Sequence, residues 1–395
     1  MYYLGIDIGK RKHVAAMLND EGRAVIKGFS FDNSIEGGNA LLEKITQHLA
    51  DLDSLVIGME ATGHYWLSLY SFLRESTMHI HVINPILTDG WRKHTEIRKR
   101  KTDKIDALMI AEMIRYGNYV ETTLSDENIL SLRNLSRFRT FLVQSVSDLK
   151  LKTISILDQV FPEYQSVFSD IFGQTSREIL KNFQTPQDWE DMETLKIQSV
   201  LEQIRFKKFG LEKIDELASL AQHSFGITFC QDSFAFQLKA LVEQISFIDL
   251  QVKEVEAKIK DILDKINTPI LTIPGIGLVT GASILGEIGD INRFSNPSQL
   301  VAFAGLDASV SQSGDFTGTH NRMSKRGSPY LRHALFQSAF VASQNDPVLK
   351  AFYLKKKSEG KHHYTAIGAV ARKMCNLIFV ILKENRPYEI RQIHE

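Results

Sequence analysis

Short apolar runs alternate with helical patterns over the first 110 residues, in an order that few folds share. Runs typical of strands occupy residues 2–8, 13–18, 24–31, 54–60 and 79–83. The first three follow one another directly, whereas helical periodicity separates the third from the fourth and the fourth from the fifth. A last helical pattern begins near Asp103. The sequence therefore predicts a mixed α/β domain at this end of the chain.

This order is that of ribonuclease-H-type (RNase H) α/β domains, whose first and fourth strands lie side by side at the centre of the sheet. Asp7 lies on the first strand and Glu60 ends the fourth, while Asp103 and Asp106 leave one face of a first helical turn. If the topology holds, four carboxylates converge at one end of the sheet.

Such a group of carboxylates predicts a metal site, because like charges held together are hard to sustain without a cation. Hard oxygen ligands suit Mg²⁺ or Mn²⁺. Paired ions would activate an attacking oxygen and stabilise the leaving oxygen at a phosphodiester. The bland interpretation is that Asp7 and Glu60 are a turn acid and a helix cap, and that Asp103 and Asp106 face the helix dipole.

The run Gly5-Ile6-Asp7-Ile8-Gly9-Lys10 also resembles the first phosphate-binding turn of actin-like and sugar-kinase-like proteins. Those proteins need a second half with another Asp-Gly-rich phosphate loop and a glycine pair for adenosine. The sequence contains neither feature, so we disfavour the kinase interpretation.

The length of 395 residues suggests two or three domains, which we place at residues 1–125, 126–265 and 266–395. The net charge is zero, but Arg92 to Lys104 holds seven Lys or Arg against two acids, and local charge is what phosphate contacts use.

Cys230 and Cys375 have no metal-ligand spacing and suggest a reducing, cytoplasmic setting. The start of the chain lacks an apolar signal region. The uncharged stretch 266–286 is broken repeatedly by Pro and Gly, which argues against a membrane span.

Two long helical patterns fill the middle of the chain. Residues 128–160 carry an apolar residue every seventh position, at Leu135, Leu142, Leu149 and Ile156. A later helix has both heptad positions apolar over four heptads: Leu238, Ile245, Val252 and Ile259, and Leu241, Ile248, Val255 and Ile262. This pattern predicts a coiled coil. The two helices would pair within one chain or join two subunits, and we favour a contribution to oligomerisation. The polar, aromatic-containing residues 161–236 carry no motif that indicates a role.

The C-terminal part is predicted to be mainly helical and to open on a helix-hairpin-helix-like turn, Thr272 to Thr280. Gly275 and Gly277 allow close backbone approach, and the helix N-terminus that follows would present amide groups to a phosphate. Proteins use such turns for sequence-independent DNA contact. A plain tight turn between helices fits equally well.

A polar serine-rich loop follows, and basic residues lie just beyond it. A serine beside a glycine, such as Ser313, would attack a phosphate whose charge Arg322, Lys325 and Arg326 hold. The residues alone do not select Ser313 over Ser309, Ser311 or Ser324, and serine-rich loops are usually only loops. Lys101 and these three basic residues are equally compatible with a solvated surface.

Taken together, motifs at both ends of the chain resemble one family, the bridge-RNA-guided insertion-sequence transposases. The N-terminal motifs resemble its RuvC-like DEDD domain: Gly5-Ile6-Asp7, Glu60-Ala61-Thr62-Gly63, Ile83-Asn84-Pro85 and Lys101-Thr102-Asp103-Lys104-Ile105-Asp106-Ala107. The C-terminal motifs resemble its serine transposase domain: Pro274-Gly275-Ile276-Gly277, Phe303-Ala304-Gly305-Leu306, Gln312-Ser313-Gly314 and Arg322-Met323-Ser324-Lys325. The middle of the chain matches only as helical, coiled-coil sequence.

The resemblance implies roles that spacing alone does not give. It assigns Mg²⁺ or Mn²⁺ binding to Asp7, Glu60, Asp103 and Asp106, and a transient phosphoserine link to DNA to Ser313. It also implies a composite active site within a homo-oligomer, a dimer or tetramer, and a noncoding RNA from the element that pairs with donor and target DNA. One departure is Ala308, where relatives often carry proline.

We therefore expect a cytoplasmic, nucleoid-associated DNA recombinase that moves its own element. The enzymatic alternative is a RuvC-like Holliday-junction resolvase or nuclease that uses the four acids and water without a covalent serine. The non-catalytic alternative is a structural nucleic-acid-binding protein, whose binding would persist in chelator and weaken with salt.

Overall fold

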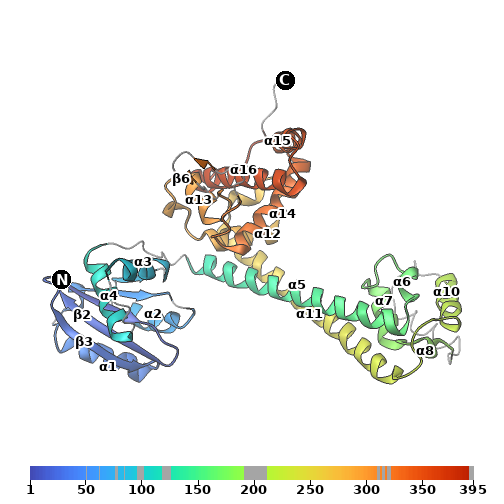
Figure 1. Cartoon of the computed structure of the whole chain (residues 1–395), viewed down its shortest axis with the longest axis horizontal. Helices are drawn as coiled ribbons and strands as arrows, with labels where there is room; N and C mark the ends of the chain where they lie inside the picture. Colours follow the sequence, from blue (N-terminus) through green and yellow to red (C-terminus); the bar gives the residue numbers. More distant parts are fainter. Residues whose placement is uncertain are drawn as a thin grey trace. The chain divides into compact units, whose positions relative to one another are not determined.

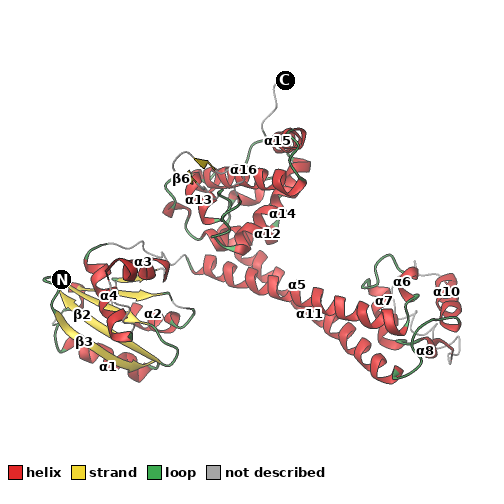
Figure 2. Ribbon diagram, in the orientation of Figure 1, coloured by secondary structure: helices red, strands yellow, loops and turns green. Residues whose placement is uncertain are grey.

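The computed structural model forms two compact units, Met1–Leu124 and Ser125–Glu395 (Figure 1). It describes residues 1–49, 51–61, 63–75, 79–83, 85–95, 102–117, 126–190, 211–308, 312–313, 316–317 and 322–390. The first unit contains a five-stranded sheet with helices, and the second is mostly helical (Figure 2). The predicted mixed α/β domain followed by a mostly helical region is confirmed.

The sheet of the first unit has the strand order β3-β2-β1-β4-β5. Its strands are β1 (Tyr2–Asp7), β2 (Lys12–Asn19), β3 (Ala24–Asp32), β4 (Leu55–Glu60) and β5 (Ile80–Ile83). The first three strands pair antiparallel, and β4 lies parallel to both β1 and β5. The first and fourth strands are therefore neighbours, as the sequence predicts for an RNase H-like sheet.

Helices pack on both faces of this sheet. They are α1 (Ile35–Thr46), α2 (Trp66–Arg74), α3 (Pro85–Thr95) and α4 (Asp103–Arg115), and a short 3₁₀ turn, Leu52–Ser54, precedes β4. Leu41 of α1 and Leu69 of α2 share one buried cluster with Leu4 of β1. Ile110 of α4 shares another with Ile83 at the end of β5, and Leu87 of α3 packs against it. The first cluster packs α1 and α2 against the sheet, and the second packs α3 and α4 against it.

Helix α4 lies directly against the backbone of β1, and Gly5 makes this possible. A Cβ atom built on Gly5 would lie 2.1 Å from the Ala107 carbonyl oxygen and 2.3 Å from the Ala111 nitrogen. Further along α4, Arg115 approaches Gly22, which follows the far end of β2. The helix therefore runs antiparallel to β1, and its first turn lies at the carboxyl end of that strand.

Replacing Gly5 with alanine should destabilise the protein by about 1–3 kcal/mol, because the added methyl group forces α4 off the sheet. The control is Gly90→Ala in α3, where an added Cβ meets nothing within 4 Å and should be neutral or slightly stabilising. Thermal unfolding of the two variants measures the difference. Equal midpoints for both would show that α4 does not need this close approach.

The second unit begins with two long helices, α5 (Glu127–Val160) and α11 (Gln231–Ile266). Leu132 near the start of α5 shares a buried cluster with Leu263 near the end of α11, whereas Leu157 clusters with Leu238. The helices therefore form an antiparallel hairpin within one chain (Figure 1). Of the predicted heptad residues of α11, Leu238, Ile245, Val255 and Ile259 are buried. The coiled-coil geometry and the contribution to oligomerisation stay predictions.

Short helices connect the two long ones. They are α6 (Tyr164–Val167), α7 (Gln174–Asn182), α8 (Pro186–Glu190) and α10 (Leu211–Gln222). Their core surrounds Tyr164, whose side chain is fully buried and whose hydroxyl lies 2.9 Å from Ser176 Oγ. Phe161, Phe183 and Trp189 share this buried core with Tyr164.

The remaining helices form a bundle. Its elements are α12 (Leu278–Ile288), α13 (Pro297–Phe303), α14 (Pro329–Asn345), α15 (Pro347–Ser358) and α16 (His363–Glu384), with the 3₁₀ turns Pro269–Thr272 and Ile291–Arg293 and the short strands β6 (Gln312–Ser313) and β7 (Phe316–Thr317). Among the described residues, α16 alone is long and apolar enough to cross a membrane. Most of its apolar residues, including Ile367, Met374 and Ile378, are buried in the bundle, so its hydropathy does not indicate a membrane protein.

Candidate active site and nucleic-acid interface

Two of the predicted metal ligands end neighbouring parallel strands. Asp7 is the last residue of β1 and Glu60 the last of β4, and the residues directly before them, Ile6 and Met59, are register partners. Both carboxylates therefore lie at the same edge of the sheet, and both are partly exposed. The turn that follows β1 is fixed by the buried His13, whose Nδ1 accepts a hydrogen bond from the Gly9 N–H at 3.3 Å. Burial lowers the pKa of His13, which favours the neutral ring that can accept this bond.

The other two predicted ligands begin α4. Thr102 caps the helix, because its Oγ1 accepts a hydrogen bond from the Ile105 N–H at 3.4 Å. Asp103 is exposed in the first turn, whereas Asp106 is only 4% exposed. Since α4 runs antiparallel to β1, this first turn lies at the edge of the sheet where β1 ends. All four predicted acids therefore belong to one edge of the first unit.

Glu60 is oriented by a residue that the sequence analysis does not single out. The Thr88 hydroxyl, buried on α3, donates a hydrogen bond to Glu60 Oε2 at 2.9 Å and lies 2.9 Å from the Pro85 carbonyl oxygen. This hydrogen bond fixes the orientation of the Glu60 carboxylate at the end of β4. The sequence could have indicated Thr88, because Pro85 marks the start of a helix and Thr88 lies one turn into it.

The donor set fits a hard cation, although the conformation is not a closed metal cage. Within the described ranges, no three His, Cys, Asp or Glu side chains lie close enough together to hold an ion. Mg²⁺ does not require such a cage, because it usually keeps several waters and binds through one or two carboxylates together with substrate phosphates. Mg²⁺ or Mn²⁺ at Asp7, Glu60, Asp103 and Asp106 stays a prediction. Lys101 lies outside the described residues.

The predicted nucleophile lies on a small hairpin of the second unit. The backbone of Ser313, at the end of β6, pairs with that of Phe316 in β7, and the Ser313 side chain lies outside the described part. An isolated bridge between Ala308 and Met323 closes the loop that contains this hairpin. Ala308, the departure from the family pattern, thus takes part in the bridge at the base of the loop.

Ser324, one of the rival serines, is already engaged. Its hydroxyl donates a short hydrogen bond to Asp307 Oδ1, and its N–H donates to the Asp307 carbonyl oxygen at 2.9 Å. The next residue, Lys325, has a φ of 52° and donates its N–H to the Gly305 carbonyl oxygen at 3.2 Å. The left-handed backbone at Lys325 and its bond to Gly305 hold the Arg322–Gly327 segment against the end of α13.

Two of the three predicted basic residues line one cavity. Arg322 and Lys325 share its wall with Arg332, Lys356, Lys361 and Arg372, which come from α14, α15, the residues after α15, and α16. Arg326 is exposed but does not line it. Arg332, Lys356, Lys361 and Arg372 are not singled out by sequence, because they lie on separate segments and no local pattern joins them.

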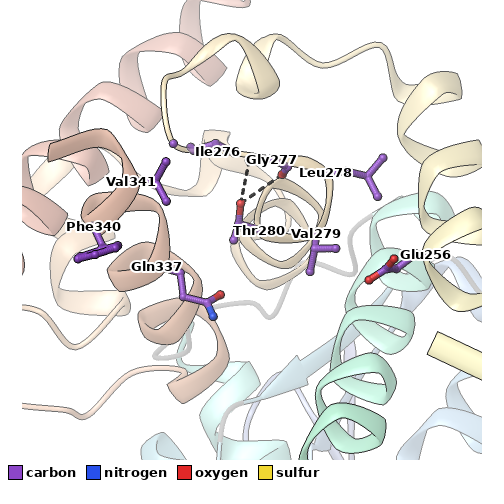
Figure 3. Close-up of a pocket in the computed structure, with 10 residues that line it drawn as sticks. Glu256, Ile276, Gly277, Leu278, Val279, Thr280, Gln337, Phe340 and Val341 are labelled. Carbon is purple, nitrogen blue, oxygen red and sulfur yellow. Dashed lines mark hydrogen bonds between the residues drawn. The ribbon is translucent and has the colours of Figure 1, made fainter. Parts of the chain in front are cut away.

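The two glycines of the predicted DNA-binding turn have different surroundings. A Cβ on Gly275, where φ is 87°, would lie 2.4 Å from the Ser338 carbonyl oxygen of α14, so glycine is required there for packing. Nothing lies within 4 Å of a Cβ on Gly277, which opens on a cavity of about 850 Å³ (Figure 3). The Gly277 N–H donates to Thr280 Oγ1 at 3.0 Å, and Phe340 and Val341 of α14 line the same cavity. Contact of Gly275 and Gly277 with nucleic acid stays a prediction.

Two family models match the two ends of the chain. Residues 4–162 match one described as "Transposase", and residues 267–354 match one described as "Transposase IS116/IS110/IS902 family". The first match covers all four predicted acids, and the second covers Ser313 and the basic segment that follows it.

Similar proteins extend over nearly the whole chain. The "Mini-circle putative transposase for IS117" of Streptomyces coelicolor is 25% identical over 92% of this chain and 89% of its own length. The "Pilin gene-inverting protein" of Moraxella lacunata is 24% identical over 100% of this chain and 99% of its own. The "Transposase for insertion sequence element IS1111A" of Coxiella burnetii is 32% identical over 30% of this chain and 33% of its own.

Proposed function

Since this chain belongs to the IS116/IS110/IS902 family of transposases, which are enzymes that act on DNA, we propose that it cuts and rejoins the DNA of its own insertion sequence. The observation that carries this proposal is the placement of Asp7, Glu60 and the first turn of α4 at one edge of the sheet. A relative described as inverting a pilin gene supports a reaction that ends in rejoined strands.

The four acids would bind Mg²⁺ or Mn²⁺ beside the scissile phosphate. When bound, the ion would neutralise charge that develops on the phosphate oxygens. Thr88 would hold the Glu60 carboxylate in one orientation, and the Thr102 cap would fix the start of α4. These groups keep the acids in place before DNA arrives, which lowers the reorganisation that the reaction requires.

Ser313 would act as the nucleophile. Its Oγ loses a proton and attacks the phosphorus, a P–O bond to one DNA strand breaks, and that strand leaves with a free hydroxyl. A hydroxyl from another strand then attacks the phosphoserine, which restores the serine and forms a new phosphodiester. One P–O bond forms for each one broken, so rejoining needs no ATP. Arg322, Lys325 and Arg326, with Lys101, would contact the nucleic-acid backbone.

The proposal includes an element-encoded guide RNA that selects donor and target DNA, and a homo-oligomer, a dimer or tetramer, with a composite active site. Both are expectations from the family resemblance. Sequencing the RNA that copurifies with the chain tests the first, because the absence of a discrete element-encoded RNA contradicts it.

A resolvase or nuclease without a covalent serine is the second candidate. The observation that favours it is that all four acids belong to the first unit, so a hydrolytic donor set needs no residue of the second. The two candidates differ in whether DNA becomes attached to the protein.

The metal role is tested by Thr88→Ala, which removes the hydroxyl that orients Glu60. Loss of a group that holds a metal ligand typically costs ten- to a hundredfold in metal affinity or activity, so the Mg²⁺ concentration for half-maximal DNA cleavage should rise by about that factor. Thr88→Ser keeps the hydroxyl and should behave as the wild type.

Thr153→Ala is the matched control, because it removes a buried threonine hydroxyl from α5 in the second unit. It should leave the Mg²⁺ requirement unchanged even if it lowers stability. An unchanged requirement in Thr88→Ala, or cleavage that persists in a chelator, would contradict a metal site at Glu60.

A further inference from the structure

We propose that the basic pocket between α14, α15 and α16 holds an unpaired strand of nucleic acid, with its phosphates against the pocket cations and a base stacked on Tyr364. This inference rests on the proposed function and adds a strand-binding site to it. Its ligand class is a single-stranded phosphodiester chain.

The charge of the pocket selects the ligand class. The cavity has a volume of about 1070 Å³, and six of its lining residues are Lys or Arg: Arg322, Lys325, Arg332, Lys356, Lys361 and Arg372. No Asp or Glu is among the described residues that line it. The first turn of α16, which includes Tyr364 and Thr365, adds the positive end of a helix dipole. A wall of this kind attracts successive phosphates rather than a single anion.

Two of these cations are held in place by backbone groups. Arg372 Nε donates to the Leu306 carbonyl oxygen at 2.7 Å, and Arg332 Nη1 lies 3.3 Å from the Ala304 carbonyl oxygen. Lys356 is partly neutralised, because its ammonium lies 2.7 Å from Glu359. The hydrogen bond from Lys356 lowers the pKa of Glu359, which favours the charged carboxylate. The two arginines are thus fixed in orientation, and less conformational freedom is lost when they meet a phosphate.

Tyr364 distinguishes an unpaired strand from a duplex. It lines the pocket with 70% of its surface exposed, although it is a large aromatic residue on a helix whose other apolar residues are buried or partly buried. Its ring centroid lies 5.3 Å from that of His363 and 5.7 Å from that of His362, so three rings cluster at the pocket rim. Exposed aromatic rings beside a basic groove are typical of single-strand sites, because a base offers its face for stacking only when it is unpaired.

The pocket adjoins the loop that carries Ser313. Met323 lines the pocket, and its backbone forms the bridge with Ala308 that closes this loop. Arg322, directly before Met323, also lines the pocket. A strand held here would therefore lie next to the base of the Ser313 loop, where a cut strand must wait before it is rejoined.

The test measures the binding of labelled oligonucleotides of about 8 nucleotides, a length within the span of one such site. The full chain carries Ser313→Ala so that no strand is cut, and the probes are single-stranded DNA, single-stranded RNA and a DNA duplex. Tyr364→Ala should weaken single-strand binding on the order of tenfold and leave its salt dependence unchanged. Tyr364→Phe keeps the ring and should bind as the parent does.

Lys361→Gln should instead reduce the slope of log K against log salt by about 0.7, the contribution of one phosphate contact in a single strand. Phe247→Ala and Lys253→Gln on α11 are the matched controls. Phe247 is an exposed aromatic residue and Lys253 an exposed lysine, and neither lines the pocket. Tighter binding of DNA or of RNA identifies which strand the pocket takes, and either result supports the site.

The inference is overturned if Tyr364→Ala binds single strands as tightly as its parent. It is also overturned if the substitution weakens duplex binding as much as it weakens single-strand binding. Binding is measured without cleavage, so this failure is separate from failure of the proposed recombinase chemistry. That chemistry fails if a chain carrying Ser313→Ala still cuts and joins DNA.

Discussion

A chain that carries Ser313→Ala is expected to form no covalent protein–DNA adduct and to lose strand joining by roughly a thousandfold or more. The reason is chemical: rejoining without ATP requires that the energy of the broken phosphodiester be kept in the phosphoserine bond. Alanine provides no oxygen for that bond, while the acids of the first unit remain. The measurement is a denaturing gel of end-labelled DNA carrying the element's ends, on which an adduct migrates with the protein.

Ser324→Ala is the decisive comparison for this experiment. Ser324 is the rival serine whose hydroxyl is described, and its hydrogen bond to Asp307 would also suit an activated nucleophile. We expect Ser324→Ala to retain the adduct, because Ser324 Oγ anchors the turn at the base of the loop. An adduct that disappears in Ser324→Ala and persists in Ser313→Ala would move the nucleophile to Ser324. Cleavage that survives in both variants without strand joining would favour the hydrolytic alternative, and cleavage with joining in Ser313→Ala would contradict Ser313 as the nucleophile.

The first unit could be predicted from sequence because its signals are local. Each strand is a short apolar run between turns, and the parallel pairing of β1 with β4 brings their carboxyl ends to one edge. Asp7 and Glu60 therefore share that edge whatever their role. The placement of Asp106 in the first turn of α4 was predicted from two acids three residues apart at the start of a helical pattern.

The second unit could be predicted only in part, because its decisive contacts join distant residues. A heptad pattern predicts that a helix face is buried but does not name its partner, and here α11 pairs with α5 of the same chain. The cations of the basic pocket belong to separate elements and meet only after the bundle folds. Nor does any local rule select one serine from a serine-rich loop, since a nucleophile is defined by its surroundings.

The second large effect is expected from Arg137→Met, which should lower the stability of the chain by about 3 kcal/mol, a shift of roughly 5–10 °C in the unfolding midpoint. Glu287, near the end of α12, is only 4% exposed. Its carboxylate accepts hydrogen bonds from Arg137 Nε at 2.6 Å, from Arg137 Nη2 at 2.9 Å and from Ser328 Oγ at 2.8 Å. The bond to Glu287 raises the pKa of Arg137, as expected for a strongly stabilised guanidinium.

Removing Arg137 leaves a buried carboxylate without its principal cation, whereas removing both partners leaves no buried charge. The double variant Arg137→Met with Glu287→Leu should therefore recover at least half of the lost stability, a coupling within the range measured for contacting pairs. Arg139→Met is the control on the same helix, since its partner Glu256 is more exposed and the pair should contribute about 1 kcal/mol or less. Calorimetry of the wild type, Arg137→Met, the double variant and Arg139→Met measures these differences in stability. A double variant that is less stable than Arg137→Met would show that Glu287 contributes through Ser328, which caps α14 directly after the Arg322–Gly327 segment.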